Sequence, residues 1–175
     1  MHKKLLPLGL AIILALGLVV PAFAETATIV LTAGTLSVTV ANISFGTVAL
    51  TGALQTVPGT TTTWTGSDLR GTGGGWHVNI RATDFCDGTH TIAASDMDMQ
   101  LANANITVVA GNTKPSSSFT AMTPLANGDQ SFASAALNDG MGTYNMAPTF
   151  QLDIAADAYA GSYSSTVTVT AVAGP

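Results

Sequence analysis

The chain has 175 residues, with five Lys and Arg against ten Asp and Glu, and only 9% of its residues are charged. A pI near 4.7 excludes a nucleic-acid-binding protein that works through basic patches. A hydrophobic share of 47% excludes a charge-rich disordered chain, because that class combines low hydrophobicity with high net charge.

The first 24 residues have the pattern of a cleaved secretion signal. Two lysines at positions 3 and 4 form the positive region, residues 5–20 form an apolar run, and Ala22-Phe23-Ala24 is the small-x-small cleavage signature. We expect cleavage after residue 24, with an uncleaved N-terminal anchor as the alternative. The mature chain, residues 25–175, is then expected to be a single secreted domain with three basic and ten acidic side chains.

The mature chain predicts strands rather than helices. Thr and Gly are abundant, and strong helix formers other than Ala are scarce. Apolar and polar residues alternate with period two in several stretches, and Pro-Gly, Asp-Gly and Asn-Gly pairs separate them. The predicted strands, in chain order, are 27–31, 35–40, 43–50, 76–82, 96–101, 106–109, 149–155 and 163–171. This pattern indicates an all-β fold, an antiparallel immunoglobulin-like β-sandwich of about eight strands.

The segments between these strands include two flexible loops. Residues 60–63 are a run of four Thr, and residues 71–75 contain four Gly. Residues 113–118 are also expected to form a loop, and residues 133–146 to form a short helix or a long loop. Loops of this kind are where a sandwich usually places its binding groups.

Two stretches resemble a known family pattern. Asp68-Leu69-Arg70-Gly71, the Gly-rich loop and Gly75-Trp76-His77-Val78 resemble the first half of a WxL-type surface domain, in which a Trp-x-Leu strand follows such a loop. Residues 156–163, leading into a Thr/Val strand, resemble the final strand of that domain. Val78 stands where the family has Leu, and Val167-Thr168-Val169 stands where a second Trp is expected. The resemblance implies an extracellular protein that associates non-covalently with cell-wall glycan or with other surface proteins.

Four residues near the first motif form the predicted ligand-binding set. Trp76 is expected in the core of a central strand, with stacking on a sugar as the alternative. Trp64 is expected in a loop, exposed beside polar residues, where it would stack on a sugar face. Arg70, beside Asp68, is expected to fix the Gly-rich loop. Arg81 is expected on the outward face of its strand, paired with an Asp of another strand.

Four carboxylates form a candidate calcium site. Asp96 and Asp98 would share one face of a strand, and Asp84 and Asp87 would approach from a turn. Calcium takes six to eight hard oxygen ligands, which such a group would begin to supply. The alternative is that each Asp serves its own turn through backbone hydrogen bonds. No other cofactor is expected.

Cys86 is the only cysteine, so the chain forms no internal disulfide. It is expected to be a small buried or half-buried thiol, with pairing to a second molecule as the alternative. Cys86 and His90 are four residues apart and could share a metal or act as nucleophile and base, but there is no Cys pair to complete a zinc site. Because the sequence also has no G-x-S-x-G elbow, we expect no enzymatic activity.

These observations predict a secreted, non-enzymatic module that binds cell-wall glycan or surface proteins, with no nucleic-acid partner and no membrane partner after signal cleavage. The alternative is a structural subunit of a pilus, fibre or surface layer, a homo-oligomer assembled by β-strand addition. Long Thr/Val strands at both ends of the chain and few charges to protect strand edges favour that alternative.

Overall fold

The computed structural model describes residues 26–175, which fall into two units divided after Leu31. The predicted secretion signal lies outside the described residues. In the first unit, residues 26–31 form no helix or strand, although the sequence predicts a strand over 27–31.

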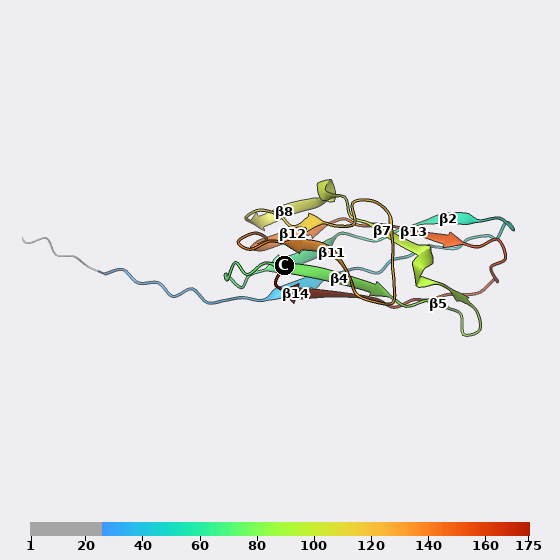
Figure 1. The fold of residues 1–175 in the computed structure, drawn as a ribbon, viewed down its shortest axis with the longest axis horizontal. Helices are drawn as coiled ribbons and strands as arrows, with labels where there is room; N and C mark the ends of the chain where they lie inside the picture. The colour runs from blue at the N-terminus through green and yellow to red at the C-terminus, as the bar shows by residue number, and fades with distance from the viewer. Residues whose placement is uncertain (1–25) are drawn as a thin grey trace, which may run out of the picture. The chain divides into compact units, whose positions relative to one another are not determined.

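The second unit, Thr32–Pro175, is all-β, as predicted (Figure 1). Its two helices, η1 (Ala94–Asp96) and η2 (Asn103–Asn105), are single 3-10 turns. Every strand pairing is antiparallel. The strands are β1 (Leu36–Thr39), β2 (Gln55–Gly59), β3 (Trp64–Asp68), β4 (Trp76–Ala82), β5 (Phe85–Cys86), β6 (Thr91–Ile92), β7 (Met97–Gln100), β8 (Ile106–Gly111), β9 (Ser116–Ser117), β10 (Thr123–Pro124), β11 (Gln130–Ala135), β12 (Gly142–Met146), β13 (Thr149–Ile154) and β14 (Val167–Ala173).

The strands form three four-stranded sheets and one hairpin. Their orders are β1-β3-β12-β8, β10-β7-β13-β2 and β14-β4-β11-β9, and β5 pairs with β6. Three chain segments run through both of the first two sheets, because β2 leads into β3, β7 into β8 and β12 into β13. These three segments lie side by side in the same order in both sheets. The break between β12 and β13 contains Pro148, which has no N–H to donate to a ladder. Such breaks divide long segments and raise the number of strands above the eight or so that the sequence suggests.

The main core lies between the first and third sheets. Trp76 on β4 packs against Tyr144 on β12 at a centroid distance of 6.4 Å, and Trp64 on β3 packs against Phe132 on β11 at 6.1 Å. All four side chains are buried. Aromatic pairs of this kind join the two layers, because each removes a large apolar area from water. The arrangement is that of a sandwich.

The period-two alternation correctly located several strands. The side chains of Trp76, Val78 and Ile80 are buried on one face of β4, while His77 and Asn79 are only partly covered. β1, β7, β8 and β13 also fall within or next to predicted strands.

Besides the strand expected over 27–31, several sequence predictions of local structure are wrong. The loop expected over 113–118 contains β9. The stretch 133–146 is neither a helix nor a long loop, since it contains the end of β11 and all of β12. β12 is stabilised by ladders on both sides, to β3 and β8, despite a sequence rich in Gly and polar residues. Residues 43–50 pair only through Ser44, which bridges to Thr60, and the final strand begins at Val167 rather than Tyr163.

Candidate functional site

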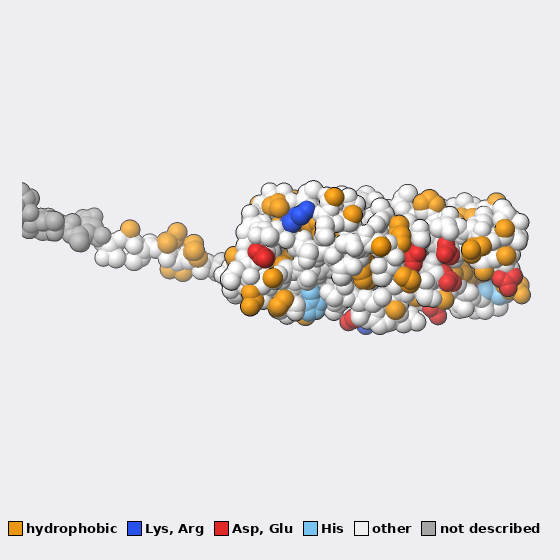
Figure 2. Space-filling model, turned by 45° about the horizontal axis from the view of Figure 1, so that its top comes forward, with side chains coloured by type: hydrophobic (Ala, Val, Ile, Leu, Met, Phe, Trp, Pro, Cys, Tyr) orange, Lys and Arg blue, Asp and Glu red, His pale blue; other side chains and the backbone are white. Residues whose placement is uncertain are grey.

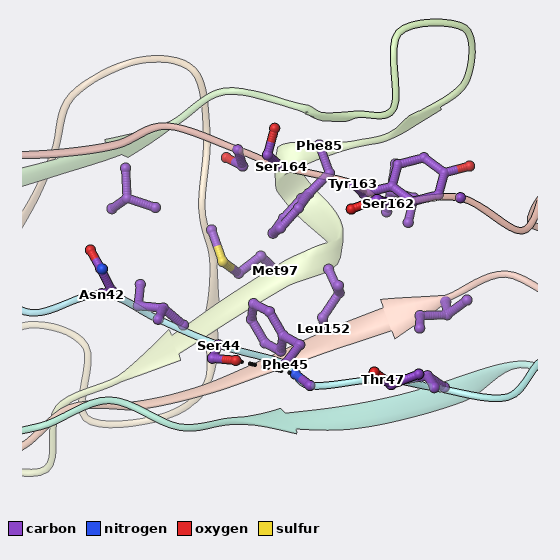
Figure 3. Close-up of a pocket in the computed structure, with 18 of the residues that line it drawn as sticks. Asn42, Ser44, Phe45, Thr47, Phe85, Met97, Leu152, Ser162, Tyr163 and Ser164 are labelled. Atoms are coloured by element: carbon purple, nitrogen blue, oxygen red, sulfur yellow. Dashed lines mark hydrogen bonds between the residues drawn. The ribbon is translucent and has the colours of Figure 1, made fainter.

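An open groove of about 1090 Å³ lies in the second unit and is here called the seam groove. One wall is the extended segment 40–50, and the other is formed by residues 158–169 (Figure 3). Phe45, Phe85, Met97 and Leu152 lie between the walls. No residue that lines the groove carries a charge. The groove is therefore an uncharged opening along one side of the sandwich, and the buried side chains of Phe85, Met97 and Leu152 border it.

Backbone hydrogen bonds hold each wall to a different layer. The Ser44 and Thr60 amides and carbonyls pair at 2.9 and 2.8 Å, which fixes the first wall beside β2 and β3. Cys86 and Ser164 pair in the same way at 3.0 and 3.1 Å, which fixes the second wall to β5. Below them, the rings of Phe45 and Phe85 meet edge to face at 6.0 Å. The walls stay apart because each is tied to its own layer.

A second, smaller hollow adjoins the seam groove and is here called the Tyr159 hollow. It has a volume of about 230 Å³, and its lining includes Tyr159, His90, Asp96 and Asp157. The Tyr159 side chain is 64% exposed, and its ring stacks on the His90 imidazole at 4.0 Å and 13°. The Tyr163 hydroxyl donates a hydrogen bond to the Tyr159 carbonyl at 3.0 Å. An exposed aromatic ring is thus held beside two carboxylates.

Asp87 positions the imidazole under the Tyr159 ring. Its Oδ1 accepts the backbone N–H groups of His90 at 2.7 Å and Thr89 at 2.8 Å, and its Oδ2 lies 3.2 Å from His90 Nδ1. These bonds, with the His90 amide as the largest cause, lower the pKa of Asp87 to about 2. Gly161 packs against the Asp87 carboxylate so closely that a Cβ at position 161 would lie 2.5 Å from Asp87 Oδ2. The two loops around the hollow therefore pack closely together.

The predicted loop position of Trp64 is wrong. Trp64 begins β3, its side chain is 1% exposed, and its ring contacts Phe132 and Phe150. The preceding Thr run gives the sequence a loop-like appearance, but burial of the indole draws this position into the core. Trp76 is equally buried and its Nε1 donates to the Gly140 carbonyl at 2.8 Å, which agrees with the core interpretation. Neither indole has a face free to stack on a sugar.

Asp68 and Arg70 form a structural ion pair beside the Gly-rich loop. Arg70 Nε lies 2.8 Å from Asp68 Oδ1, and its Nη2 donates to Asp68 Oδ2 at 2.9 Å and to the Gly75 carbonyl at 2.9 Å. The side chain of Asp68 is 1% exposed and that of Arg70 is 19% exposed. The hydrogen bonds from Arg70 hold the pKa of Asp68 below its ordinary value. Arg70 fixes the loop, as expected, and neither residue lines the seam groove.

The four carboxylates of the candidate calcium site are not brought together. Within residues 26–175, no three His, Cys, Asp or Glu side chains lie close enough to hold a metal ion. Asp84 accepts the Ala94 amide at 2.8 Å, Asp87 binds its own turn, and Asp98 accepts from Gln151 at 2.7 Å. Asp96 lies in η1, so it does not share a strand face with Asp98. The alternative, that an Asp serves its own turn, describes Asp87, whereas Asp84 binds the start of η1, ten positions further on.

Cys86 and Arg81 also differ from expectation. Cys86 is exposed, not buried or half-buried, and its Sγ accepts the Gly88 amide at 3.2 Å. Arg81 pairs with Asp129 at 3.7 Å, but Asp129 precedes β11 and does not belong to a strand. Both side chains of this pair are more than half exposed.

The sequence did not point to Tyr159 as a candidate binding residue. The signal available was an aromatic residue set among Ala, Asp and Gly, where no strand partner is expected. The stacking on His90, which lies 69 positions earlier in the chain, arises only from the fold.

Comparison with known proteins found one family. The model of the family described as WxL domain surface cell wall-binding matches residues 24–170, a range that contains both stretches of the predicted resemblance. A search of the curated proteins found no match. In the described part of the chain, no helix has the length and apolar character needed to cross a membrane.

Proposed function

The chain belongs to the WxL family of surface cell-wall-binding domains, and from this membership we propose that it is a secreted, non-enzymatic module that holds the wall non-covalently. The family match covers nearly the whole mature chain, so the sandwich itself is the binding module. The residues that meet the wall are exposed groups on its surface.

In this proposal, the Trp motif stabilises the sandwich, and Trp76 does not itself contact the wall. Trp76, at the start of β4, is buried, and the segment 167–169 that replaces the second Trp lies on the neighbouring strand, where Val169 pairs with Ile80. Both motif positions therefore serve the ladder between β4 and β14. Trp76 is unable to touch a glycan while the core stays closed, whereas Val167 and Val169 are half-buried and line the seam groove.

The single observation that carries the proposed contact is the exposed, supported ring of Tyr159. Aromatic rings pack on the apolar faces of sugars, and carboxylates accept hydrogen bonds from sugar hydroxyls. The Tyr159 hollow offers both, with Asp96 and Asp157 on its lining. Because His90 covers one face of the ring, the ring is already oriented before a ligand arrives.

Sedimentation with purified cell walls tests this proposal. Tyr159→Ala is expected to lower the fraction of protein that sediments at least threefold, because it removes the aromatic face. Leu137→Ala is the matched control, since Leu137 is also 64% exposed and apolar but does not line the hollow. If Tyr159→Ala sediments with cell walls as fully as wild type, the assignment is refuted. If both variants sediment equally less than wild type, the binding is nonspecific and depends on exposed apolar area.

A separate measurement tests the expectation that the protein does not cleave the wall. Walls incubated with the protein are expected to release no soluble fragments, measured by mass spectrometry of the supernatant. Release of fragments above that of a heat-inactivated control would contradict the non-enzymatic part of the proposal.

A further inference from the structure

Residues 26–32 are a strand-type segment without a strand partner. They read Thr-Ala-Thr-Ile-Val-Leu-Thr, which is rich in β-branched residues. In an extended chain, Ala27, Ile29 and Leu31 share one face, and Thr28 and Val30 lie on the other. In the structure this segment joins no sheet, and Ile29, Val30 and Leu31 are 82%, 89% and 84% exposed. Exposed contiguous apolar side chains of this kind mark a contact surface.

The seam groove has the features that an incoming strand requires. β14 is the edge strand of its sheet and pairs only with β4, so its outer backbone groups carry no ladder. β1, the edge strand of the first sheet, lies beside β14 without pairing to it. Between the walls, half-buried apolar side chains such as Phe45 can be met by alternate side chains of an added strand (Figure 3).

The segment and the groove also match in charge. No residue that lines the groove is charged, and residues 26–33 contain no charged side chain. Charged side chains are among the means by which proteins protect an open strand edge, and the groove has none. In the space-filling view, most of the presented face is uncharged, and the carboxylates stand as separate groups on it (Figure 2). An uncharged apolar strand therefore enters without burying an unpaired charge.

We infer that residues 26–32 of one molecule add as a strand in the seam groove of a second copy of this chain, along the wall that leads into the start of β14, with Ala27, Ile29 and Leu31 directed into the groove. The partner is the chain itself. Tyr159 lines both the seam groove and the Tyr159 hollow, and the proposed contact with the wall is assigned to the hollow side of its ring.

Chain length argues against insertion into the molecule's own groove. The Gly34 amide donates to the Leu69 carbonyl at 2.8 Å, next to the start of β1, whereas the groove begins only after β1, at Val40. Seven extended residues span about 23 Å. If the chain turned back at Gly34, most of this length would lie along β1, short of the groove. Segment and groove are different surfaces, so the contact is head to tail and repeats from copy to copy, in a closed ring or an open filament.

The association state of the full secreted chain tests the inference. Size-exclusion chromatography with light scattering is expected to show oligomers that grow with protein concentration. Ile29→Asp places a charge in the groove and is expected to weaken association at least tenfold. Val30→Asp is the matched control, because Val30 is equally exposed in the free chain but points away from the groove in the added strand, so its association is expected to stay within threefold of wild type.

A substitution on the acceptor side completes the test. Val40 lines the groove and is 43% exposed, so Val40→Asp is expected to fold and to weaken association as Ile29→Asp does. Circular dichroism confirms that each variant is folded. A wild-type chain that stays monomeric at millimolar concentration would overturn the inference. Equal loss of association in the Ile29 and Val30 variants would also overturn it, because it would indicate unspecific sticking, and so would association that survives Val40→Asp.

Wall sedimentation of Ile29→Asp separates this inference from the proposed function. The monomeric variant keeps its Tyr159 hollow and is expected to bind walls. If association is lost and wall binding remains, the two surfaces are independent. If wall binding falls with association while Tyr159→Ala has no effect, the wall contact is assigned to the wrong surface and the strand contact stands.

Discussion

Replacing Arg70 by Ala removes the charge partner of a nearly buried carboxylate. Three hydrogen bonds from the guanidinium are lost, two to Asp68 and one to the Gly75 carbonyl. Removing one member of a buried ion pair costs about 3–5 kcal/mol, and the partial exposure of Arg70 places the expected loss near the lower limit, about 3 kcal/mol. For a domain of this size, that corresponds to a melting temperature lower by about 6–12 °C.

Urea unfolding followed by tryptophan fluorescence measures this loss, because both indoles are buried in the folded chain. Arg81→Ala is the matched control, since its pair with Asp129 is long and more than half exposed, and it is expected to cost less than about 0.5 kcal/mol. If Arg70→Ala costs no more than Arg81→Ala, the pair does not hold the Gly-rich loop as argued.

The same variant has a defined pH dependence. The pKa of Asp68 lies below its ordinary value of 3.8 in the folded chain, so the pair stabilises the fold fully above that value. As pH falls through the lowered pKa, the carboxylate becomes protonated and the contribution is lost. The difference in unfolding free energy between wild type and Arg70→Ala is therefore expected to narrow below about pH 4. A difference that stays constant down to pH 2 would contradict the argument.

Three further predictions concern the other loop and the core. The Asp87 carboxyl is expected to titrate near pH 2 by NMR, because two backbone amides of its own loop bind the ionised form, and a midpoint near 4 would show those bonds to be absent in solution. Trp76→Phe is expected to lower the free energy of unfolding in urea by about 2 kcal/mol, because it leaves the buried Gly140 carbonyl without its donor. An unchanged free energy of unfolding would show that the indole hydrogen bond does not stabilise the fold. Gly111→Ala is expected to cost at least about 2 kcal/mol, since Gly111 has φ of 119° and a Cβ would collide with the facing strand, while Gly128→Ala, at an open position, is expected to change stability by less than about 0.5 kcal/mol.

The strands that the sequence predicted well are those whose burial alternates along the chain. β4 is the best case, because its apolar residues face the core and its polar residues do not. β12 was missed for the opposite reason, since Gly142, Thr143 and Asn145 hide the two buried residues Tyr144 and Met146. Its stability comes from two neighbouring ladders, which are pairings between residues far apart in the sequence.

The candidate site was the part least accessible to sequence reasoning. Trp64 looked exposed because the residues before it are Thr, yet two rings from β11 and β13 cover it. Conversely, the sequence did not predict Tyr159 as a binding residue, although the fold leaves its ring exposed to solvent and stacks it on His90. Which aromatic residue is buried depends on the packing of distant strands, and the local pattern does not contain that information.

By itself, the sequence determined the all-β class and the WxL family, and it pointed to Arg70 beside the Gly-rich loop, because these depend on local alternation, motif spacing and neighbours two to five residues apart. Only the tertiary structure decided that the walls of the seam groove stay apart, that Trp64 is internal, and that residues 26–31 remain outside every sheet. The physical reason is that burial and strand pairing are set by long-range contacts, whose partners a single stretch of sequence does not name.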